Sequence, residues 1–324
     1  MSAPRRWRAL AWLAGAVLWA PMPAQAGAPL LNEPIAPVPQ SLHQDPARAA
    51  LGRQLFRDPR LSANHSVSCF SCHDTRQGGV DQRARSRGFG GQLTAVNTPT
   101  VLNAALNFRQ FWNGRAATLE AQIEQVVANP VEMGASWPEV VRRIQADPGY
   151  RRAFAALYRD GVSQANIANA IATYERTLIT PNAPFDRYLR GDEQAISPAA
   201  RAGYLKFKQY GCAACHQGVN VGGNMYQKLG VMNDYFAARG HGSEADLGRF
   251  LVTGDPLDRY VFKVPGLRNV AQSAPYFHDA SAATLEQAVD VMFRFQLGRI
   301  APQQDKDAII AFLKTLSAPP EGLP

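Results

Sequence analysis

Apolar residues recur at every third or fourth position in several separate stretches, and this spacing predicts amphipathic helices. One such stretch follows Asp45-Pro46, where Asp45 can cap a helix and Pro46 suits its first position; Asp58-Pro59 ends it. The same pattern predicts helices that open at Thr118 and at Ser197-Pro198, and helices over residues 137–146, 149–159, 163–179, 284–295 and 303–316. Between them, 74–100 and 217–280 are long and rich in turn residues, which predicts loops with little strand.

All four cysteines of the 324-residue chain lie in two copies of the pattern C-x-x-C-H, at Cys69/Cys72/His73 and Cys212/Cys215/His216. This is the attachment pattern of c-type haem, in which two thiols bond to one porphyrin and the adjacent histidine binds its iron. A zinc site or a disulfide is the alternative. Two complete copies, with no other cysteine in the chain, favour two covalently bound haem c groups.

The order of helix, C-x-x-C-H, long loop and terminal helix occurs twice along the chain. We therefore expect an all-α protein with two cytochrome-c-like domains, each built around one haem. The expected boundaries are residues 41–180 for the first domain and 198–324 for the second, with 181–197 as a polar linker. Residues 27–40 contain several prolines and are expected to form an extended N-terminal segment.

Residues 1–26 have the pattern of a secretory signal peptide, in which three arginines precede the apolar run Ala9–Ala20 and an A-x-A cleavage site follows. That run is too short to span a bilayer, so we expect a periplasmic protein whose mature form has no membrane span; a retained anchor is the alternative. The formal charge of +8 is not arranged in long Lys/Arg runs, so no nucleic acid partner is expected.

The chain resembles the bacterial di-haem cytochrome c peroxidases. The wider family includes di-haem enzymes that oxidise protein side chains, such as the one that matures methylamine dehydrogenase. The resemblance spans about residues 50–300 and is carried by L-S-A-N-H-S-V-S-C-F-S-C-H, N-T-P-T-V-L-N-A, F-W-N-G-R-A-A-T-L-E-A-Q, N-P-V-E-M-G, F-D-R-Y-L-R-G-D, G-C-A-A-C-H-Q-G-V-N-V-G-G, E-A-D-L-G-R-F and V-P-G-L-R-N-V-A-Q-S-A-P-Y-F-H-D. It implies a homodimer that reduces hydrogen peroxide with electrons from a small cytochrome c or cupredoxin, and a calcium ion between the two domains.

The same resemblance assigns roles at the first haem, which would be the peroxidatic one. Glu132 matches the catalytic glutamate, and a carboxyl group above a haem can move a proton between the two oxygens of peroxide. Gln122 matches a glutamine that hydrogen-bonds bound peroxide, and Trp112 matches a tryptophan between the haems. Without the resemblance, Glu132 would read as a solvated loop acid and Trp112 as core packing.

At the second haem, which would transfer electrons, Met292 matches the methionine that binds iron opposite His216. A thioether ligand raises the reduction potential and closes the iron to substrate. Met292 also continues a helical apolar pattern, so a core methionine is the alternative, and Met225 or Met232 are other candidate ligands. His278 matches a histidine near the haems. The Asn97 side chain and the carbonyl groups of Ser273 and Pro275 match the calcium ligands of the family.

One position departs from the family pattern. Many members carry a histidine after the first haem motif that closes the peroxidatic iron until the second haem is reduced, and Phe89 aligns with it. Phenylalanine cannot bind iron, so we expect an open first haem, unless another side chain fills the place or the loop is shifted. Two other functions stay open: peroxide-dependent oxidation of a dedicated partner protein, and non-enzymatic electron transfer. Met292 argues against the first, and Glu132 argues against the second.

Overall fold

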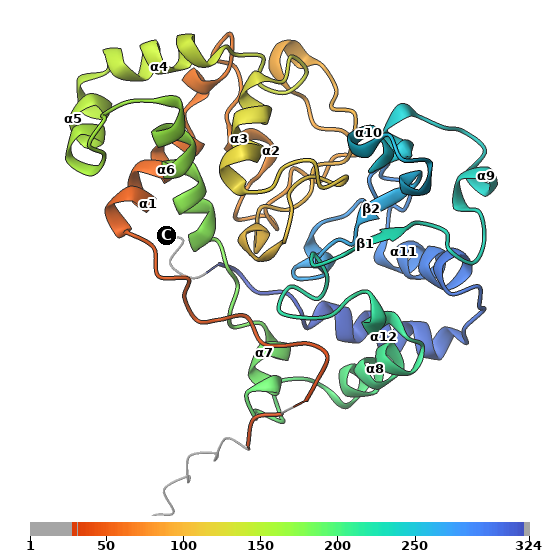
Figure 1. The fold of residues 1–324 in the computed structure, drawn as a ribbon. Helices are drawn as coiled ribbons and strands as arrows, with labels where there is room; N and C mark the ends of the chain where they lie inside the picture. Colours follow the sequence, from red (N-terminus) through yellow and green to blue (C-terminus); the bar gives the residue numbers. More distant parts are fainter. Residues whose placement is uncertain (1–27, 31, 321–324) are drawn as a thin grey trace, which may run out of the picture.

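The computed structural model describes residues 28–30 and 32–320, so the predicted signal peptide lies outside the described residues. The chain is mostly helical, as Figure 1 shows. Its elements are α1 Pro46–Phe56, α2 Cys69–Cys72, α3 Leu119–Ala128, α4 Trp137–Ala146, α5 Pro148–Leu157, α6 Gln164–Thr177, α7 Pro184–Leu189, α8 Pro198–Gln209, β1 Tyr226–Lys228, α9 Tyr235–Arg239, α10 Phe250–Thr253, β2 Val261–Lys263, α11 Leu285–Val291 and α12 Gln303–Lys314.

The predicted helix starts are confirmed by their capping contacts. Asp45 accepts hydrogen bonds from the backbone N–H groups of the first turn of α1, and Pro46 occupies the first helical position. Thr118 caps α3 and Ser197 caps α8 in the same way. Each cap satisfies an N–H group that has no partner inside its own helix, which fixes where the helix begins.

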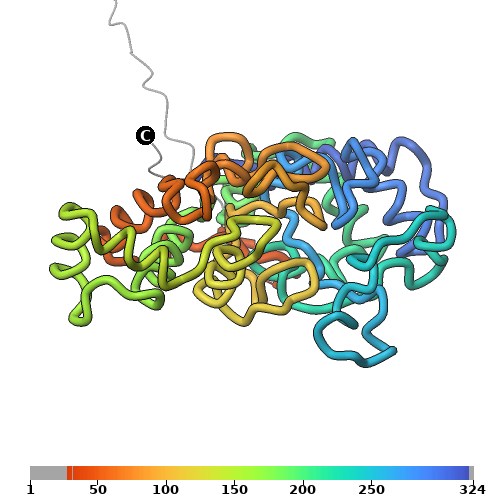
Figure 2. Tube along the Cα trace, turned by 90° about the horizontal axis from the view of Figure 1, so that it is seen from above, coloured from red at the N-terminus to blue at the C-terminus, as the bar shows by residue number. Residues whose placement is uncertain are grey.

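Two crossing helix pairs organise two apolar cores. In the first half of the molecule α1 packs on α6, and in the second half α8 packs on α12. A glycine allows each close approach, because a Cβ atom at Gly52 would lie 1.8 Å from the Ala170 carbonyl oxygen, and one at Gly203 would lie 1.8 Å from that of Ala308. The repeated helix order seen in the sequence therefore corresponds to two similarly packed halves, which lie side by side in Figures 1 and 2.

The segment before α1 and the segment predicted as a linker both belong to the second core. The proline-rich stretch places Ile35 in that core, and residues 181–197 contain α7, whose Phe185 is fully buried there. A buried ion pair holds the two segments together, because Arg268 contacts Asp186 at 2.8 Å and also donates to the carbonyl oxygen of Ala36. Figure 1 shows the N-terminal segment running from α1 past α7.

The expectation of an all-α fold is wrong in one detail, because β1 and β2 form a small antiparallel sheet within the predicted loop 217–280. This sheet holds the loop of residues 110–116, which belongs to the first half. Lys263 N–H donates to the Trp112 carbonyl at 2.8 Å, and the Tyr226 hydroxyl donates to the Gly114 carbonyl at 3.3 Å. The second half therefore fixes the position of a first-half loop. Within the described part of the chain, no helix is long and apolar enough to cross a membrane.

Candidate active site

Both C-x-x-C-H motifs present their histidine in the same way. The Nδ1 atom of His73 lies 3.1 Å from the Gly79 carbonyl oxygen, and that of His216 lies 3.3 Å from the Val221 carbonyl oxygen. A hydrogen bond from Nδ1 orients an imidazole and leaves Nε2 available to a metal. Burial lowers the pKa of both rings, to about 4 for His216, which favours the neutral form that binds iron.

The four cysteines are unpaired and partly buried. Burial raises the pKa of the Cys69, Cys72 and Cys212 thiols, to about 11 for the latter two. These three thiols are therefore protonated at neutral pH. Short helical turns begin at Cys69 and at Cys212, and in each motif the backbone N–H of the histidine donates to the carbonyl of the first cysteine at 3.0 Å. These features fit covalently attached haem at both motifs.

A large, mostly apolar cavity surrounds the second motif. Cys212, Cys215 and His216 line it, and Met292 lines it as well. Met292 opens a short π-helical turn, Met292–Gln296, at the end of α11, and such turns often occur at functional sites. Met232 and Met225 do not line this cavity. The structure therefore brings Met292, of the three candidate methionines, together with His216.

Trp112 and His278 line the same cavity, and their ring centroids lie 6.3 Å apart. The indole N–H of Trp112 donates to the Asn97 carbonyl at 2.8 Å, which fixes the ring between the two halves. His278 is buried, and its Nε2 atom lies 2.7 Å from Asp246. Burial alone would raise the pKa of Asp246, but hydrogen bonds from Arg239, the Ser243 N–H and His278 outweigh it and lower the pKa to about 2. The Asp246 carboxylate therefore holds His278 in place.

The three residues predicted to bind calcium also meet at this cavity. Asn97, Ser273 and Pro275 all line it. Asn97 uses its Nδ2 group to donate to the Arg83 carbonyl at 2.9 Å, so its side-chain oxygen can face an ion. Its backbone N–H donates to the His278 carbonyl at 2.8 Å, which joins the two halves at this point. Oxygen donors of this kind suit calcium, and the arrangement fits the predicted site.

Glu132 lies near the first motif, in the tight turn that follows α3. Asn129 forms this turn, because its carbonyl accepts from the N–H groups of Glu132 and Gly134. Burial raises the pKa of the Glu132 carboxyl, and nearby Arg115 and a hydrogen bond from Asn129 partly oppose this rise. The charge of Glu132 in turn contributes to the raised pKa of Cys72, so the carboxyl lies within electrostatic reach of the haem attachment site. A half-buried carboxyl with a raised pKa suits proton transfer near neutral pH.

Phe89 packs against the turn that carries Glu132. Its backbone N–H donates to the Glu132 carbonyl at 2.7 Å, and its ring covers Gly134, where a Cβ atom would lie 2.7 Å from the ring. At Gly88 a Cβ atom would lie 2.0 Å from the carbonyl oxygen of Val131, so the two segments are in close contact. The segment around Phe89 is thus attached to the Glu132 turn.

Gln122 is half-buried on α3, and no hydrogen bond joins it to Glu132 in the described part of the chain. The sequence predicts no role at the site for Arg115, Gln125 or Tyr226. The position of Arg115 in F-W-N-G-R, three residues after Trp112, was the one available signal. Tyr226 lies within residues 217–280, which the sequence predicts to be loop. Nothing in the sequence therefore indicates that it contacts residues 110–116.

The fold and the two motifs define a class: mostly helical proteins of the c-type cytochrome kind, with two haem-attachment motifs on either side of an interface between two halves. A family model described as di-haem cytochrome c peroxidase matches residues 46–194. The chain is 45% identical over 296 residues to cytochrome c551 peroxidase of Nitrosomonas europaea, covering 91% of this chain and 87% of that protein. The chain belongs to the di-haem cytochrome c peroxidase family.

Two further comparisons agree with this assignment. Cytochrome c peroxidase Ccp of Escherichia coli (strain K12) is 46% identical over 287 residues; the match covers 88% of this chain and 61% of the length of that protein. The crystal structure of a MauG-like protein associated with microbial copper homeostasis superimposes with a TM-score of 0.76 at 30% identity, and covers 91% of this chain and 94% of that one.

Proposed function

We propose that this chain is a periplasmic peroxidase that carries two haem c groups and a calcium ion and reduces hydrogen peroxide to water. Two electrons come one at a time from a small cytochrome c or cupredoxin, so that H₂O₂ + 2 H⁺ + 2 e⁻ gives 2 H₂O. The observation that carries the proposal is the placement of Glu132, a half-buried carboxyl with a raised pKa, beside the first haem motif. Two haem domains and a homodimer are part of the proposal, with residues 181–197 assigned to the second domain because they contain α7 and pack in its core.

At the first site, His73 would hold the haem iron, and the haem would supply the electrons that cleave the O–O bond. Glu132 would act as the general base, with its carboxylate accepting a proton from one oxygen of the peroxide. It would then return this proton to the other oxygen, which leaves as water. Gln122, on the neighbouring helix α3, orients the peroxide through a hydrogen bond.

At the second site, His216 and Met292 would hold the haem iron, and a thioether ligand such as Met292 would exclude peroxide and raise the reduction potential. The second haem thus stores an electron rather than binding substrate. Trp112 lines this cavity and belongs to the loop that also carries Arg115 toward Glu132. We assign to Trp112 the electron path between the two haems.

A steady-state assay with purified protein carrying both haems tests the proposal, with hydrogen peroxide as oxidant and reduced cytochrome c as donor. We expect rapid turnover, and a loss of about 10²–10⁴-fold in Glu132→Gln, which keeps the shape of the side chain but removes its proton-transfer function. No peroxide consumption by the wild type would instead indicate an electron carrier. Consumption only in the presence of one dedicated protein would indicate the modifying function.

The first haem is proposed to be open to peroxide without prior reduction of the second haem, because Phe89 cannot bind iron. Its attachment to the Glu132 turn supports this proposal. EPR of the fully oxidised protein tests it: a high-spin ferric signal from one of the two haems is expected. A wholly low-spin spectrum would mean that a protein side chain closes the first iron, and would refute the open site while leaving the peroxidase assignment to the turnover assay.

A further inference from the structure

A lysine of the small sheet is buried without an acidic partner. Lys263 is the last residue of β2, and only 8% of its surface is exposed. No ion pair or side-chain hydrogen bond joins its ammonium group to any of the described residues. Burial therefore acts on it unopposed and lowers the pKa of Lys263 to about 8. Because lysine is almost never buried without a partner, this cation indicates that a bound anion balances its charge in the functional protein.

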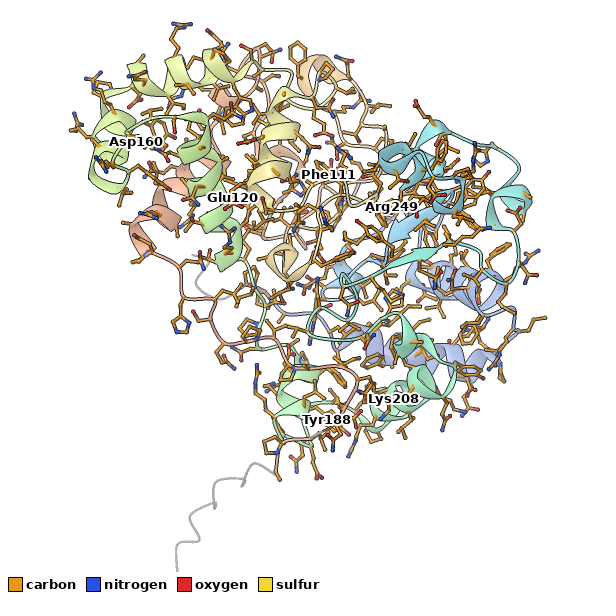
Figure 3. The ribbon with its side chains drawn as sticks, viewed as in Figure 1. Phe111, Glu120, Asp160, Tyr188, Lys208 and Arg249 are labelled. Atoms are coloured by element: carbon orange, nitrogen blue, oxygen red, sulfur yellow. The ribbon has the colours of Figure 1, made fainter. Side chains whose placement is uncertain are left out.

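The strand that carries Lys263 is anchored at both ends. Lys263 pairs with Tyr226 across the sheet, and its N–H donates to the Trp112 carbonyl at 2.8 Å. At the start of the same strand, the Arg249 N–H donates to the Val261 carbonyl at 2.7 Å. Figure 3 labels Arg249 in this region, where the two halves meet. These contacts fix the backbone from which the lysine side chain extends.

Lys263 lines the same cavity as Cys212, Cys215 and His216. The cavity lining is mostly apolar, and none of the described aspartates or glutamates contributes to it. Haem has the complementary character, because its porphyrin is a large apolar ring that carries propionate carboxylates. A carboxylate in an apolar cavity needs a cation as partner, and Lys263 is a buried cation that lacks a carboxylate. The lining residues thus fit a haem that has a propionate at Lys263.

No other buried cation of the cavity is available for this role among the described residues. Outside the haem motif, the other titratable side chains of the lining are exposed or have partners in the chain: Lys228 is exposed, Arg268 pairs with Asp186, the Tyr276 hydroxyl donates to the Val270 carbonyl, and His278 is bonded to Asp246. Lys263 is therefore the group to which we assign the binding of the haem carboxylate.

We propose that Lys263 forms an ion pair with a propionate of the second haem and thereby keeps the reduction potential of that haem insensitive to pH. The proposal rests on haem attachment at the second motif, which belongs to the proposed function, and not on peroxide turnover. With the lysine present, the propionate stays ionised and the pair is neutral as a whole. Without it, the propionate charge would stabilise the oxidised iron and lower the potential. Burial would also raise the pKa of the unpaired carboxyl, so that reduction of the iron would draw a proton from solvent onto it.

The test is a spectroelectrochemical titration of the protein carrying both haems, from about pH 6 to about pH 8, the range into which a buried carboxyl can be shifted. In Lys263→Met the potential of the second haem should fall with rising pH more steeply than in the wild type. The two potentials should converge at the acid end, where the protonated propionate leaves the site neutral again. The potential of the first haem should move less than that of the second.

Lys314→Met is the matched control, because Lys314 is exposed on α12 and does not line the cavity. It removes the same charge from the second half and should follow the wild type. Lys263→Arg keeps the charge and should retain the wild-type pH dependence, whereas Lys263→Gln loses the charge and should behave as Lys263→Met. The Gln variant decides the matter if the Met variant does not mature with haem.

Three results would overturn the proposal: an unmoved potential in Lys263→Met, a uniform shift without added pH dependence, or a larger shift at the first haem than at the second. A steep pH dependence of the second haem in the wild type would overturn it as well, and this measurement needs no variant. Absence of haem at Cys212 and Cys215 by mass spectrometry would instead overturn the haem content of the proposed function, whatever the role of Lys263.

Discussion

Gly134→Ala tests whether the segment around Phe89 positions the Glu132 turn. Gly134 has a φ of +62°, and an added Cβ atom would lie 2.7 Å from Cδ1 of Phe89, whereas ordinary contacts begin at 3.4 Å. The ring or the turn must therefore move by roughly 0.7 Å. Because the Phe89 N–H is hydrogen-bonded to the Glu132 carbonyl at 2.7 Å, this displacement would be passed to Glu132, whose carboxyl we propose as the proton-transfer group.

Two contributions to the loss of stability in Gly134→Ala can be separated. The left-handed backbone conformation costs a non-glycine residue about 1–2 kcal/mol, and crowding of a packed contact costs a further ~1–3 kcal/mol. We expect the free energy of unfolding to fall by about 2–5 kcal/mol. A displacement near 1 Å at a reacting group can reduce a rate by about 10²-fold, so peroxide turnover should fall by between about tenfold and a hundredfold.

Gly90→Ala is the control, because Gly90 lies in the same segment with a φ of +65° and nothing within 4 Å of an added Cβ atom. It should show the backbone cost in urea unfolding and retain wild-type turnover. The double variant Phe89→Ala/Gly134→Ala removes the clash and should recover most of the turnover lost in Gly134→Ala. The reasoning is refuted if Gly134→Ala turns over peroxide at the wild-type rate, or if the double variant is no faster than Gly134→Ala alone.

Three further predictions address other parts of the molecule. Met292→His should lower the potential of the second haem by on the order of 0.1 V, a fraction of the ~0.8 V range that axial ligands span; an unchanged potential in a spectroelectrochemical titration would exclude Met292 as a ligand. Arg268→Met leaves Asp186 buried without its partner and should cost about 3–5 kcal/mol in urea unfolding, whereas Arg176→Met, which removes the half-exposed pair with Glu120, should cost less than about 1 kcal/mol. Burial raises the pKa of Glu175 to about 8 from the ordinary 4.5, so stability is lost as pH rises between these values; Glu175→Gln should be more stable than the wild type at pH 8 and equal to it at pH 4, as thermal unfolding at both pH values would show.

The sequence was sufficient for features that depend on local chemistry. Asp45-Pro46 and Ser197-Pro198 predicted helix starts because a capping side chain and a proline act within one turn of the chain. The cysteine and histidine spacing predicted two haem-attachment sites for the same reason. The role of α7 was beyond such reasoning, since its polar sequence surrounds Phe185 and Asp186, whose burial depends on Arg268 more than 80 residues later.

Residues that act across the interface were predicted only through resemblance, if at all. Met292 and Asn97 came from the family pattern, and the structure places both at the cavity of the second motif. For Arg115, the resemblance implied no role. Its relation to Glu132 arises because the 110–116 loop closes between Gln110 and Ala116 and is then clamped from the other half.

The small β1–β2 sheet explains how the second half holds the 110–116 loop in place. Strands of three residues are too short to show a period in sequence, and β1 and β2 are stable only because they pair with each other and contact the first half. Through Tyr226 and Lys263 they bind the loop that carries both Trp112 and Arg115. One loop thus places an aromatic ring in the cavity of the second motif and a cation near the carboxyl at the first. Any movement of the second half relative to the first would displace Trp112 and Arg115 together, because the same two hydrogen bonds hold their loop.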